Sequence, residues 1–173
     1  MASVLWQDLT AEELREKAAK DAVVVLPVAS MEQHGPHLPV GVDTILCGTV
    51  CKRAAEAVSK TPVVVAPVLW CGMAEHHMAF GGTFTFDIPT YRAVLLCFLK
   101  SIARHGFKRA FIVNGHGGNI DTLHVALRRL QPRYKNALLT GASYWELAER
   151  EIAELCDGPR KSVGHACEVE TSM

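Results

Sequence analysis

Four side chains of the kinds that bind metal ions lie within twelve consecutive positions of one segment. The segment runs from Met31 to Asp43, reads MEQHGPHLPVGVD, and carries Glu32, His34, His37 and Asp43. Its two prolines and two glycines exclude a regular helix. Imidazole and carboxylate ligands without a thiolate suit Zn, Mn or Fe in a hydrolytic site. The segment therefore predicts a metal site on a rigid loop.

The spacing of these residues indicates how they would share metal ions. Glu32 and His34 would point to the same side of an extended chain, because they are two residues apart. Asp43, after the constrained excursion, could return to bridge two metals about 3.5–4 Å apart. The alternative is a simple turn in which Asp43 is the N-cap of a following helix. Each residue alone fits that alternative, whereas the whole set favours the metal site.

Further ionisable side chains follow other predicted strands. Open α/β sheets bind ligands beyond the carboxyl ends of their strands, so we expect these side chains to join one site. They are Glu75, His76 and His77, then His116, and then His165, Glu168 and Glu170.

The segment NGHGGN, Asn114 to Asn119, carries three glycines around one histidine. Glycine permits positive φ angles and a close approach of the backbone to a ligand. The spacing of a phosphate-binding loop is absent. His116 is therefore a candidate metal ligand, and the alternative is a tight turn that exposes it by chance.

Strands and helices alternate along the chain, which predicts a three-layer α/β/α fold with a mostly parallel central sheet. A capping box of Thr10 and Glu13 predicts a first helix, and Pro89 and Gly106 are expected to bound a later one. Strands are expected at 22–28, 62–70, 109–114 and 136–143, helices from about 44 and over 89–105, 120–131 and 144–156, and a loop from 157 to the end.

Composition excludes several classes of protein. The chain has 173 residues, the length of one domain, and 18 basic and 18 acidic side chains give a formal net charge of zero. Neither nucleic acid nor an anionic membrane is expected as a partner. No apolar run approaches the roughly 20 residues of a membrane span. The six scattered cysteines read as reduced thiols, which favours a cytoplasmic protein.

Three motifs, MEQHGPHLPVGVD, NGHGGN and GHACEVETS, together resemble the creatinine amidohydrolase (creatininase) family of metal-dependent amidohydrolases. The resemblance runs from about Val23 to the last residue. It implies hydrolysis of a C–N bond in a cyclic amide or a formamide-type small molecule by water activated at two divalent ions, Zn, Mn or Fe. It also implies a homo-oligomer, often a hexamer.

The resemblance assigns a role to each matching position. It implies metal ligands at Glu32, His34, Asp43 (bridging), His116 and Glu168, with His165 as the proton shuttle and Glu168 completing the catalytic pair. Glu75, His76 and Gly117 are expected to contact substrate, and His37 and Asn114 to orient ligands through hydrogen bonds. Creatininase itself has a tyrosine and a glutamate where this chain has Gly117 and Gly118, so creatinine is not the expected substrate.

Two other functions remain open. The chain could be a binding or scaffold protein that keeps the fold with an incomplete centre, or a peptidase-type member of the family. Trp70 and Trp145 could wall a pocket for a planar ligand, although core packing is the commoner use of such residues. Family members continue beyond the ETS motif, whereas this sequence ends at Met173. We therefore expect a single domain over 1–173 that lacks the usual C-terminal part.

Overall fold

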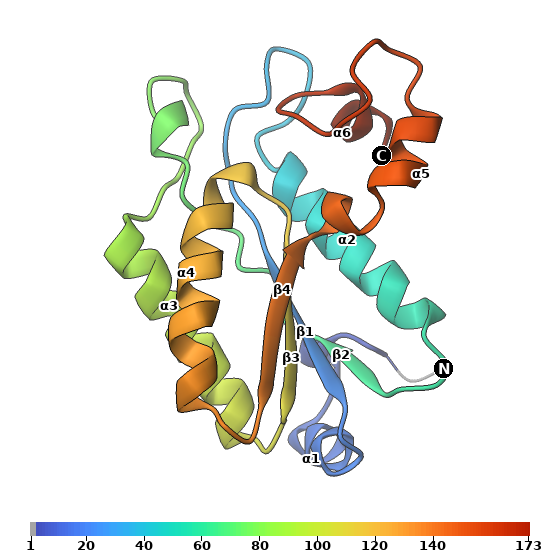
Figure 1. Cartoon of the computed structure of the whole chain (residues 1–173), viewed down its shortest axis with the longest axis vertical. Helices are drawn as coiled ribbons and strands as arrows, with labels where there is room; N and C mark the ends of the chain where they lie inside the picture. The colour runs from blue at the N-terminus through green and yellow to red at the C-terminus, as the bar shows by residue number, and fades with distance from the viewer. Residues whose placement is uncertain (1–2) are drawn as a thin grey trace.

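The computed structural model describes residues 3–173 and shows a four-stranded parallel sheet between two layers of helices (Figure 1). The strands lie in the order β2-β1-β3-β4, and each neighbouring pair is parallel. They are β1 (Val23–Val28), β2 (Val63–Val65), β3 (Arg109–Asn114) and β4 (Leu138–Ser143). The predicted α/β/α architecture is confirmed.

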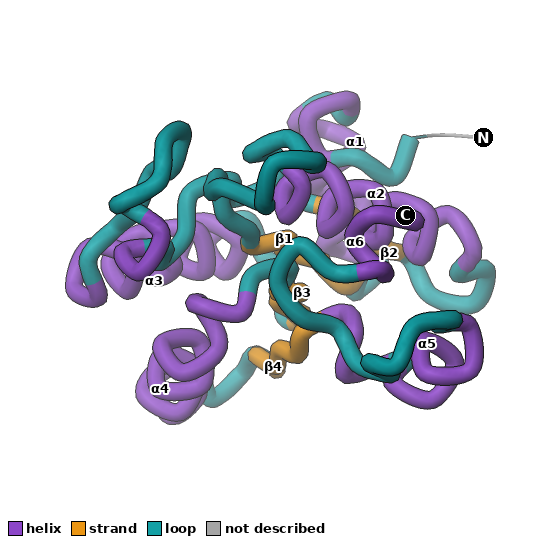
Figure 2. Tube along the Cα trace, turned by 90° about the horizontal axis from the view of Figure 1, so that it is seen from above, coloured by secondary structure: helices purple, strands orange, loops and turns teal. Residues whose placement is uncertain are grey.

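The central strands are apolar at consecutive positions because both of their faces are covered. Val24, Leu26 and Val28 of β1 are fully buried and pack against the side of the sheet that carries α3 and α4. Val25 of β1 belongs to the opposite face, where it packs with Cys47 and Cys51 of α2. Helices therefore cover both faces of the sheet, as Figure 2 shows from above.

The helices divide between the two faces. One face carries α3 (Ile88–Arg104) and α4 (Ile120–Leu130), and the other carries α2 (Val42–Ala57). Helix α1 (Ala11–Ala19) lies at the amino ends of the strands (Figure 1). The remaining elements are α5 (Glu149–Leu155), α6 (Glu168–Ser172) and five 3₁₀ turns: η1 (Trp6–Asp8), η2 (Glu75–His77), η3 (Gly117–Asn119), η4 (Gln131–Arg133) and η5 (Tyr144–Leu147).

The predicted helix boundaries correspond to specific capping contacts. Thr10 accepts a hydrogen bond from the Glu13 N–H at 3.3 Å, and the Glu13 carboxylate accepts one from the Thr10 N–H at 2.7 Å. The predicted capping box is therefore confirmed. Helix α3 begins after Asp87, which accepts from the Thr90 N–H, and it ends just before Gly106 at φ +89°.

Two expectations at the C-terminal side were wrong. The predicted helix over 144–156 is interrupted at Ala148, whose φ of −138° and ψ of 28° separate η5 from α5. The tail, expected to be a loop, ends in the short helix α6. Over residues 3–173, no helix combines the length and the apolar character that crossing a membrane requires.

Candidate metal centre

Four of the predicted ligands meet in the interior, beyond the carboxyl ends of β1 and β3. Glu32, His34, Asp43 and His116 each expose 4% or less of their surface. Glu32 and His34 come from the loop after β1, Asp43 from the first turn of α2, and His116 from the turn after β3. Charged and imidazole groups are rarely buried this deeply unless they pair or bind a metal.

Asp43 lies between two histidines and presents a different oxygen to each. Its Oδ1 lies 3.0 Å from His34 Nε2, and its Oδ2 lies 2.9 Å from His116 Nδ1. The N-cap of α2 is Gly41, and Asp43 is the second residue inside the helix. The alternative of Asp43 as an N-cap is therefore wrong, and its carboxylate serves the cluster instead.

Backbone carbonyl groups fix the orientation of both rings. His34 Nδ1 lies 3.1 Å from the carbonyl oxygen of Glu32, and His116 Nε2 lies 3.0 Å from that of Met73. A carbonyl oxygen only accepts, so these two ring nitrogens carry protons and donate. Each ring consequently turns its other nitrogen toward the carboxylates, which is the arrangement found in metal-bound histidines.

The cluster fits a cation. Among residues 3–173, His34 Nε2 and Asp43 Oδ2 are buried without a hydrogen bond of acceptable alignment, although each has a partner at about 3 Å. Hydrogen bonds weaken steeply as donor and acceptor lose alignment, so the short distances alone do not satisfy these two atoms. Lone pairs of imidazole and carboxylate that converge in this way require positive charge between them.

The pKa shifts of His34, His116 and Asp43 also indicate that the cluster favours positive charge. Burial would lower the pKa of His34, but contacts with Asp43 and Glu170 raise it to about 10. Burial also opposes the charge on His116, yet Asp43 and Glu32 raise its pKa to about 10. Burial would raise the pKa of Asp43, but the two imidazoles hold that pKa below its usual value. Bound cations would replace the protons that these rings otherwise hold.

The C-terminal carboxylate of the cluster is Glu170, whereas Glu168 was the predicted ligand. Glu170 Oε1 lies 3.5 Å from His34 Nε2, and its Oε2 accepts from the Cys167 N–H at 3.0 Å. Glu168 is exposed, and its carboxylate accepts from the N–H groups of Asp157 and Gly158, which lower its pKa. The structure thus places Glu168 away from the centre, because the two glutamates lie on different sides of α6.

Two buried asparagines hold the turn that carries His116. Asn114 accepts from the His116 N–H at 3.1 Å and donates to its carbonyl at 2.8 Å, so it holds the backbone of this turn. Asn119, which sequence reasoning missed, accepts from the Met73 N–H and donates to the Ala29 carbonyl and Asn114. The asparagine network therefore joins the loops that follow three strands.

The glycines of the same turn differ in the space around them. A Cβ at Gly118 would lie 2.2 Å from the Met73 carbonyl oxygen and 2.5 Å from His116 Nε2. This position has no room for a side chain beside the hydrogen bond that orients His116. Among the described residues nothing lies within 4 Å of a Cβ at Gly117, which faces the cavity. Gly117 is therefore placed where a substrate could contact it.

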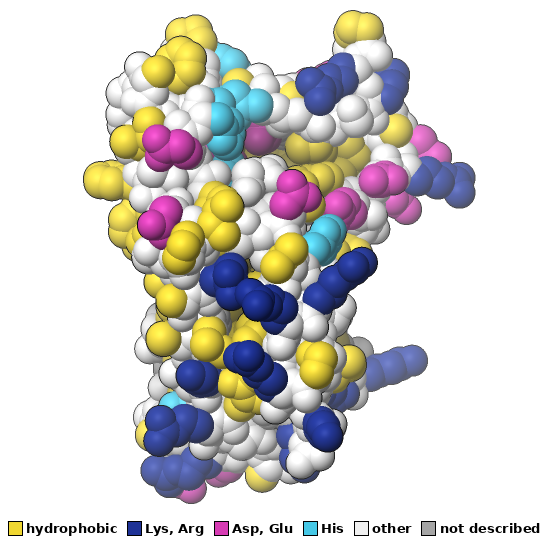
Figure 3. Space-filling model, turned by 60° about the vertical axis from the view of Figure 1, so that its left-hand side comes forward, with side chains coloured by type: hydrophobic (Ala, Val, Ile, Leu, Met, Phe, Trp, Pro, Cys, Tyr) yellow, Lys and Arg dark blue, Asp and Glu magenta, His cyan; other side chains and the backbone are white. Residues whose placement is uncertain are grey.

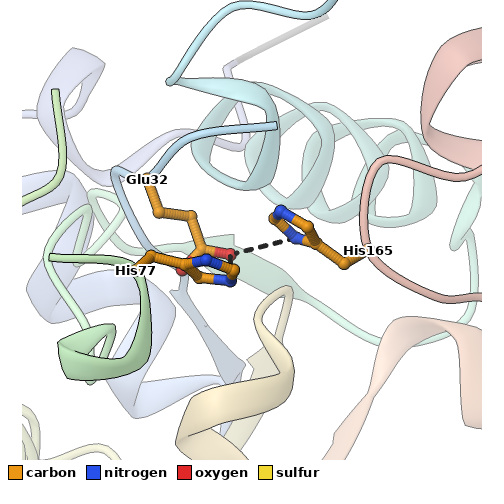
Figure 4. Close-up of side chains that lie close together, drawn as sticks. All are labelled: Glu32, His77 and His165. Carbon is orange, nitrogen blue, oxygen red and sulfur yellow. Dashed lines mark ion pairs between the residues drawn. The ribbon is translucent and has the colours of Figure 1, made fainter. Parts of the chain in front are cut away.

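Three further histidines lie on the outer side of the cluster. His77 Nε2 and His165 Nδ1 approach Glu32 Oε1 at 3.7 and 3.5 Å, from two different loops (Figure 4). Burial lowers the pKa of His77. Besides Glu32–His34–Asp43, the groups Glu32–His76–His116 and Glu32–His77–His165 have donor atoms close enough to hold an ion.

Other predicted residues lie outside the cluster. His37 is exposed and contacts Thr171 of α6 at 3.3 Å through Nε2, so it meets the segment beside Glu170 and not a ligand. Glu75 is exposed and does not belong to the cavity lining within residues 3–173. Trp70 packs edge-on against Phe84, away from the cavity.

A cavity of about 320 Å³ opens directly onto the cluster. Apart from the ionisable residues, its walls include Gly117, Ile120, Trp145 and Val163. Figure 3 shows histidine side chains reaching the surface at this end of the molecule, while most of the Lys and Arg side chains in that view lie over its middle and its other end. The size of the cavity and its partly apolar wall suit a small organic molecule.

Comparison with known proteins identifies related sequences. The family model described as creatinine amidohydrolase matches residues 7–173. The creatinine amidohydrolase of Pseudomonas putida is 33% identical over 160 residues, which cover 85% of this chain and 60% of that protein. The mycofactocin precursor peptide peptidase of Mycolicibacterium smegmatis is 34% identical over 119 residues, 66% of this chain and 47% of that protein. The chain thus spans 47–60% of the length of these relatives.

Solved structures agree with the sequence match. A creatinine amidohydrolase (creatininase) structure has a TM-score of 0.84 at 30% identity and is matched over 99% of this chain and 71% of that chain. A creatininase described as containing Mn gives a TM-score of 0.83 at 30% identity, covering 98% and 71%. A mutant creatininase of the Zn-Zn type gives 0.81 at 29% identity, covering 99% and 71%.

Proposed function

Because the chain belongs to the creatinine amidohydrolase family, we propose that it is a metal-dependent amidohydrolase for a C–N bond in a small cyclic amide or formamide-type molecule. One observation carries the proposal. Asp43 turns one oxygen to His34 and the other to His116, in a buried cluster where His34 Nε2 and Asp43 Oδ2 have no hydrogen-bond partner within residues 3–173. Such an arrangement suits a carboxylate that bridges two cations.

The chain offers two sets of ligands that share Asp43. One set is Glu32, Asp43 and His116, since His116 Nδ1 lies 3.2 Å from Glu32 Oε1 as well as 2.9 Å from Asp43. The other is His34, Asp43 and Glu170. Zn or Mn is supported by the donor types and by the metals of the related creatininases. Bound there, the ions would lower the pKa of a water molecule and polarise an amide carbonyl.

The remaining chemistry belongs to residues around the cavity. His165 lies at its mouth with 34% of its side chain exposed, where it can exchange protons with solvent and a leaving nitrogen. A positioned acid or base of this kind contributes about 10²–10⁴-fold to a rate. Trp145 and Ile120 supply apolar wall that limits the access of bulk water to the reacting bond.

A peptidase is the second candidate function, and the open space at Gly117 favours it. A peptide needs room on both sides of the bond to be cleaved, and Gly117 leaves the cavity wall free of a side chain. The similarity to a mycofactocin precursor peptide peptidase supports the same alternative. The two candidates share the metal centre and differ in the substrate that the cavity admits.

Metal content and turnover test the proposal together. Chelator-treated protein would be reloaded with Zn or Mn, analysed for metal, and assayed with cyclic amides, formamides and short peptides. Two equivalents of metal with hydrolysis of the small amides would support the proposal, and cleavage of peptides alone would favour the peptidase. Metal binding without any turnover would leave a scaffold, and failure to bind metal would overturn the metal centre itself.

A further inference from the structure

The amide of Gln33 contacts three groups around the outer histidines. Its Oε1 lies 2.8 Å from the N–H of Gly35. Its Nε2 lies 2.9 Å from His77 Nδ1 and 2.9 Å from His165 Nε2. The half-buried amide of Gln33, whose neighbours in the sequence are the proposed ligands Glu32 and His34, thus connects the loop after β1 with the turn η2 and with the C-terminal segment.

The orientation of this amide is determined by its backbone partner. A backbone N–H can only donate, so the Gln33 atom that faces Gly35 must be the oxygen. This contact therefore determines which atom of the Gln33 amide is oxygen and which is nitrogen, an assignment that is otherwise ambiguous. Gly35 has a φ of +65°, and a Cβ there would lie 3.2 Å from the ring of His37. The turn that delivers this N–H therefore requires glycine.

The amide nitrogen then dictates where each imidazole carries its proton. The Gln33 NH₂ group has two hydrogens, one for each ring, so His77 Nδ1 and His165 Nε2 both accept. The ring proton must lie on the opposite nitrogen in each case, which is Nε2 in His77 and Nδ1 in His165. These are the two nitrogens that approach Glu32 Oε1, at 3.7 and 3.5 Å (Figure 4).

We propose that Gln33 is a positioning residue that holds His77 and His165 with their N–H groups turned toward Glu32 and so keeps them from binding metal. The donor atoms of Glu32, His77 and His165 lie close enough together to resemble a third metal site. A metal would need a lone pair on each facing nitrogen, and the Gln33 amide leaves a proton there instead. The cations are thereby directed to the sets that contain His34 and His116.

The consequence for catalysis rests on the proposed function. A ring held between Gln33 and Glu32 turns its N–H toward the Glu32 carboxylate and keeps that proton. While its Nε2 accepts from Gln33, His165 cannot take up a second proton. His165 can therefore deliver a proton to a leaving nitrogen only when its contact with Gln33 opens. Gln33 would then influence turnover without touching either the metal or the substrate.

The position of the ring protons can be measured directly by two-bond ¹H–¹⁵N correlation spectra of histidine-labelled protein, first without metal and at alkaline pH. His77→Gln and His165→Gln variants would assign the signals among the eight histidines. We expect the Nε2–H form for His77 and the Nδ1–H form for His165. On addition of zinc, the signals of His34 and His116 should shift, while those two protons remain. A proton on either nitrogen that faces Gln33, or its displacement by zinc from either ring, would overturn the proposal.

Gln33→Glu reverses the direction of the hydrogen bonds to the two rings, because a carboxylate oxygen accepts where the amide nitrogen donated. The nitrogen facing residue 33 should become protonated in both rings. Gln7→Glu makes the same charge change at an exposed position and should leave both rings as in the parent. With metal and substrate, Gln33→Glu should lower kcat by about 10–100-fold and change KM less. Unchanged ring protons in Gln33→Glu would overturn the proposal. The spectra of the parent protein test the proposal by themselves, even where that variant does not fold or the proposed activity is absent.

Discussion

Replacing Asp43 by Asn should remove most of the stabilisation that metal gives this protein. Asp43 is the carboxylate between His34 Nε2 and His116 Nδ1, at 3.0 and 2.9 Å. Asn keeps the shape of the side chain but loses the charge and one of the two oxygens that would bridge the ions. The metal-free fold should tolerate the change, because the neighbouring imidazoles can lose their extra protons when the carboxylate is gone.

The size of the effect follows from mass action. Metal at about 100 times its Kd stabilises the folded state by about 2.7 kcal/mol. For a chain of this size each kcal/mol raises the Tm by about 2–4 °C, so the parent should gain about 5–11 °C. Loss of an outer-shell partner weakens metal binding by about 10–100-fold, and loss of a bridging ligand should reach at least the upper value. At the same metal concentration the variant should gain only about 0.4 kcal/mol, or about 1–2 °C.

Asp121→Asn is a matched control for this measurement. Asp121 is also the second residue of its helix, α4, and it is exposed. Removing a carboxylate from a first turn costs about 0.3–1 kcal/mol through the helix dipole, so both variants share that cost. The assay is thermal unfolding of chelator-treated protein with and without Zn or Mn. A full metal shift in Asp43→Asn, or no shift in the parent, would refute the reasoning.

Three further predictions test separate parts of the structure. Glu170→Gln should weaken metal binding by at least about tenfold in a metal titration, and Glu168→Gln should change it little; the reverse order would contradict the placement of the two glutamates. Gly118→Ala should lower the free energy of unfolding by about 1–3 kcal/mol in urea and weaken metal binding, because its Cβ would collide with the hydrogen bond that orients His116. Gly117→Ala should be neutral. Equal effects of the two variants would argue against crowding at Gly118. Tyr91→Phe should be neutral or stabilising by up to about 1 kcal/mol, because the buried Tyr91 hydroxyl has no hydrogen-bond partner within residues 3–173. A fall in the free energy of unfolding by more than about 1 kcal/mol would reveal a partner.

The sheet and most of the cluster could be predicted because apolar runs and loops identify strand ends. Val23–Val28 and the Ala110–Val113 part of Arg109–Asn114 are consecutive apolar stretches, which are typical of strands covered on both faces. In a parallel sheet the segments after such strands meet at one edge, so Glu32, His34 and His116 had to approach one another. This inference needs no knowledge of side-chain conformations, and the structure brings the three residues together.

The choice between Glu168 and Glu170 could not be made without knowing the backbone of the tail. In an extended segment the two side chains would point the same way, because they are two residues apart. In the helix α6 they differ by about 200° around the axis, so only one can face the cluster. The spacing of Cys167 and Glu170 matches a capping box with cysteine in place of serine or threonine, and it was the available signal for this helix.

The groups that orient the ligands left no signal of their own in the sequence. Metal ligands are ionisable side chains, yet the proton positions here depend on the carbonyl groups of Glu32 and Met73 and on the amide of Gln33, while Asn119 holds the Met73 backbone. Every residue has a carbonyl, so no residue type reveals which one a histidine will meet. Gln33 acts on His165 across 132 positions of sequence, and only the turn at Gly35 defines which end of its amide faces the ring. Most of the ligands follow from residue types, whereas the proton positions on the histidines follow from backbone geometry. The turn at Gly35 fixes the Gln33 amide, and that amide decides which histidines remain free to bind metal.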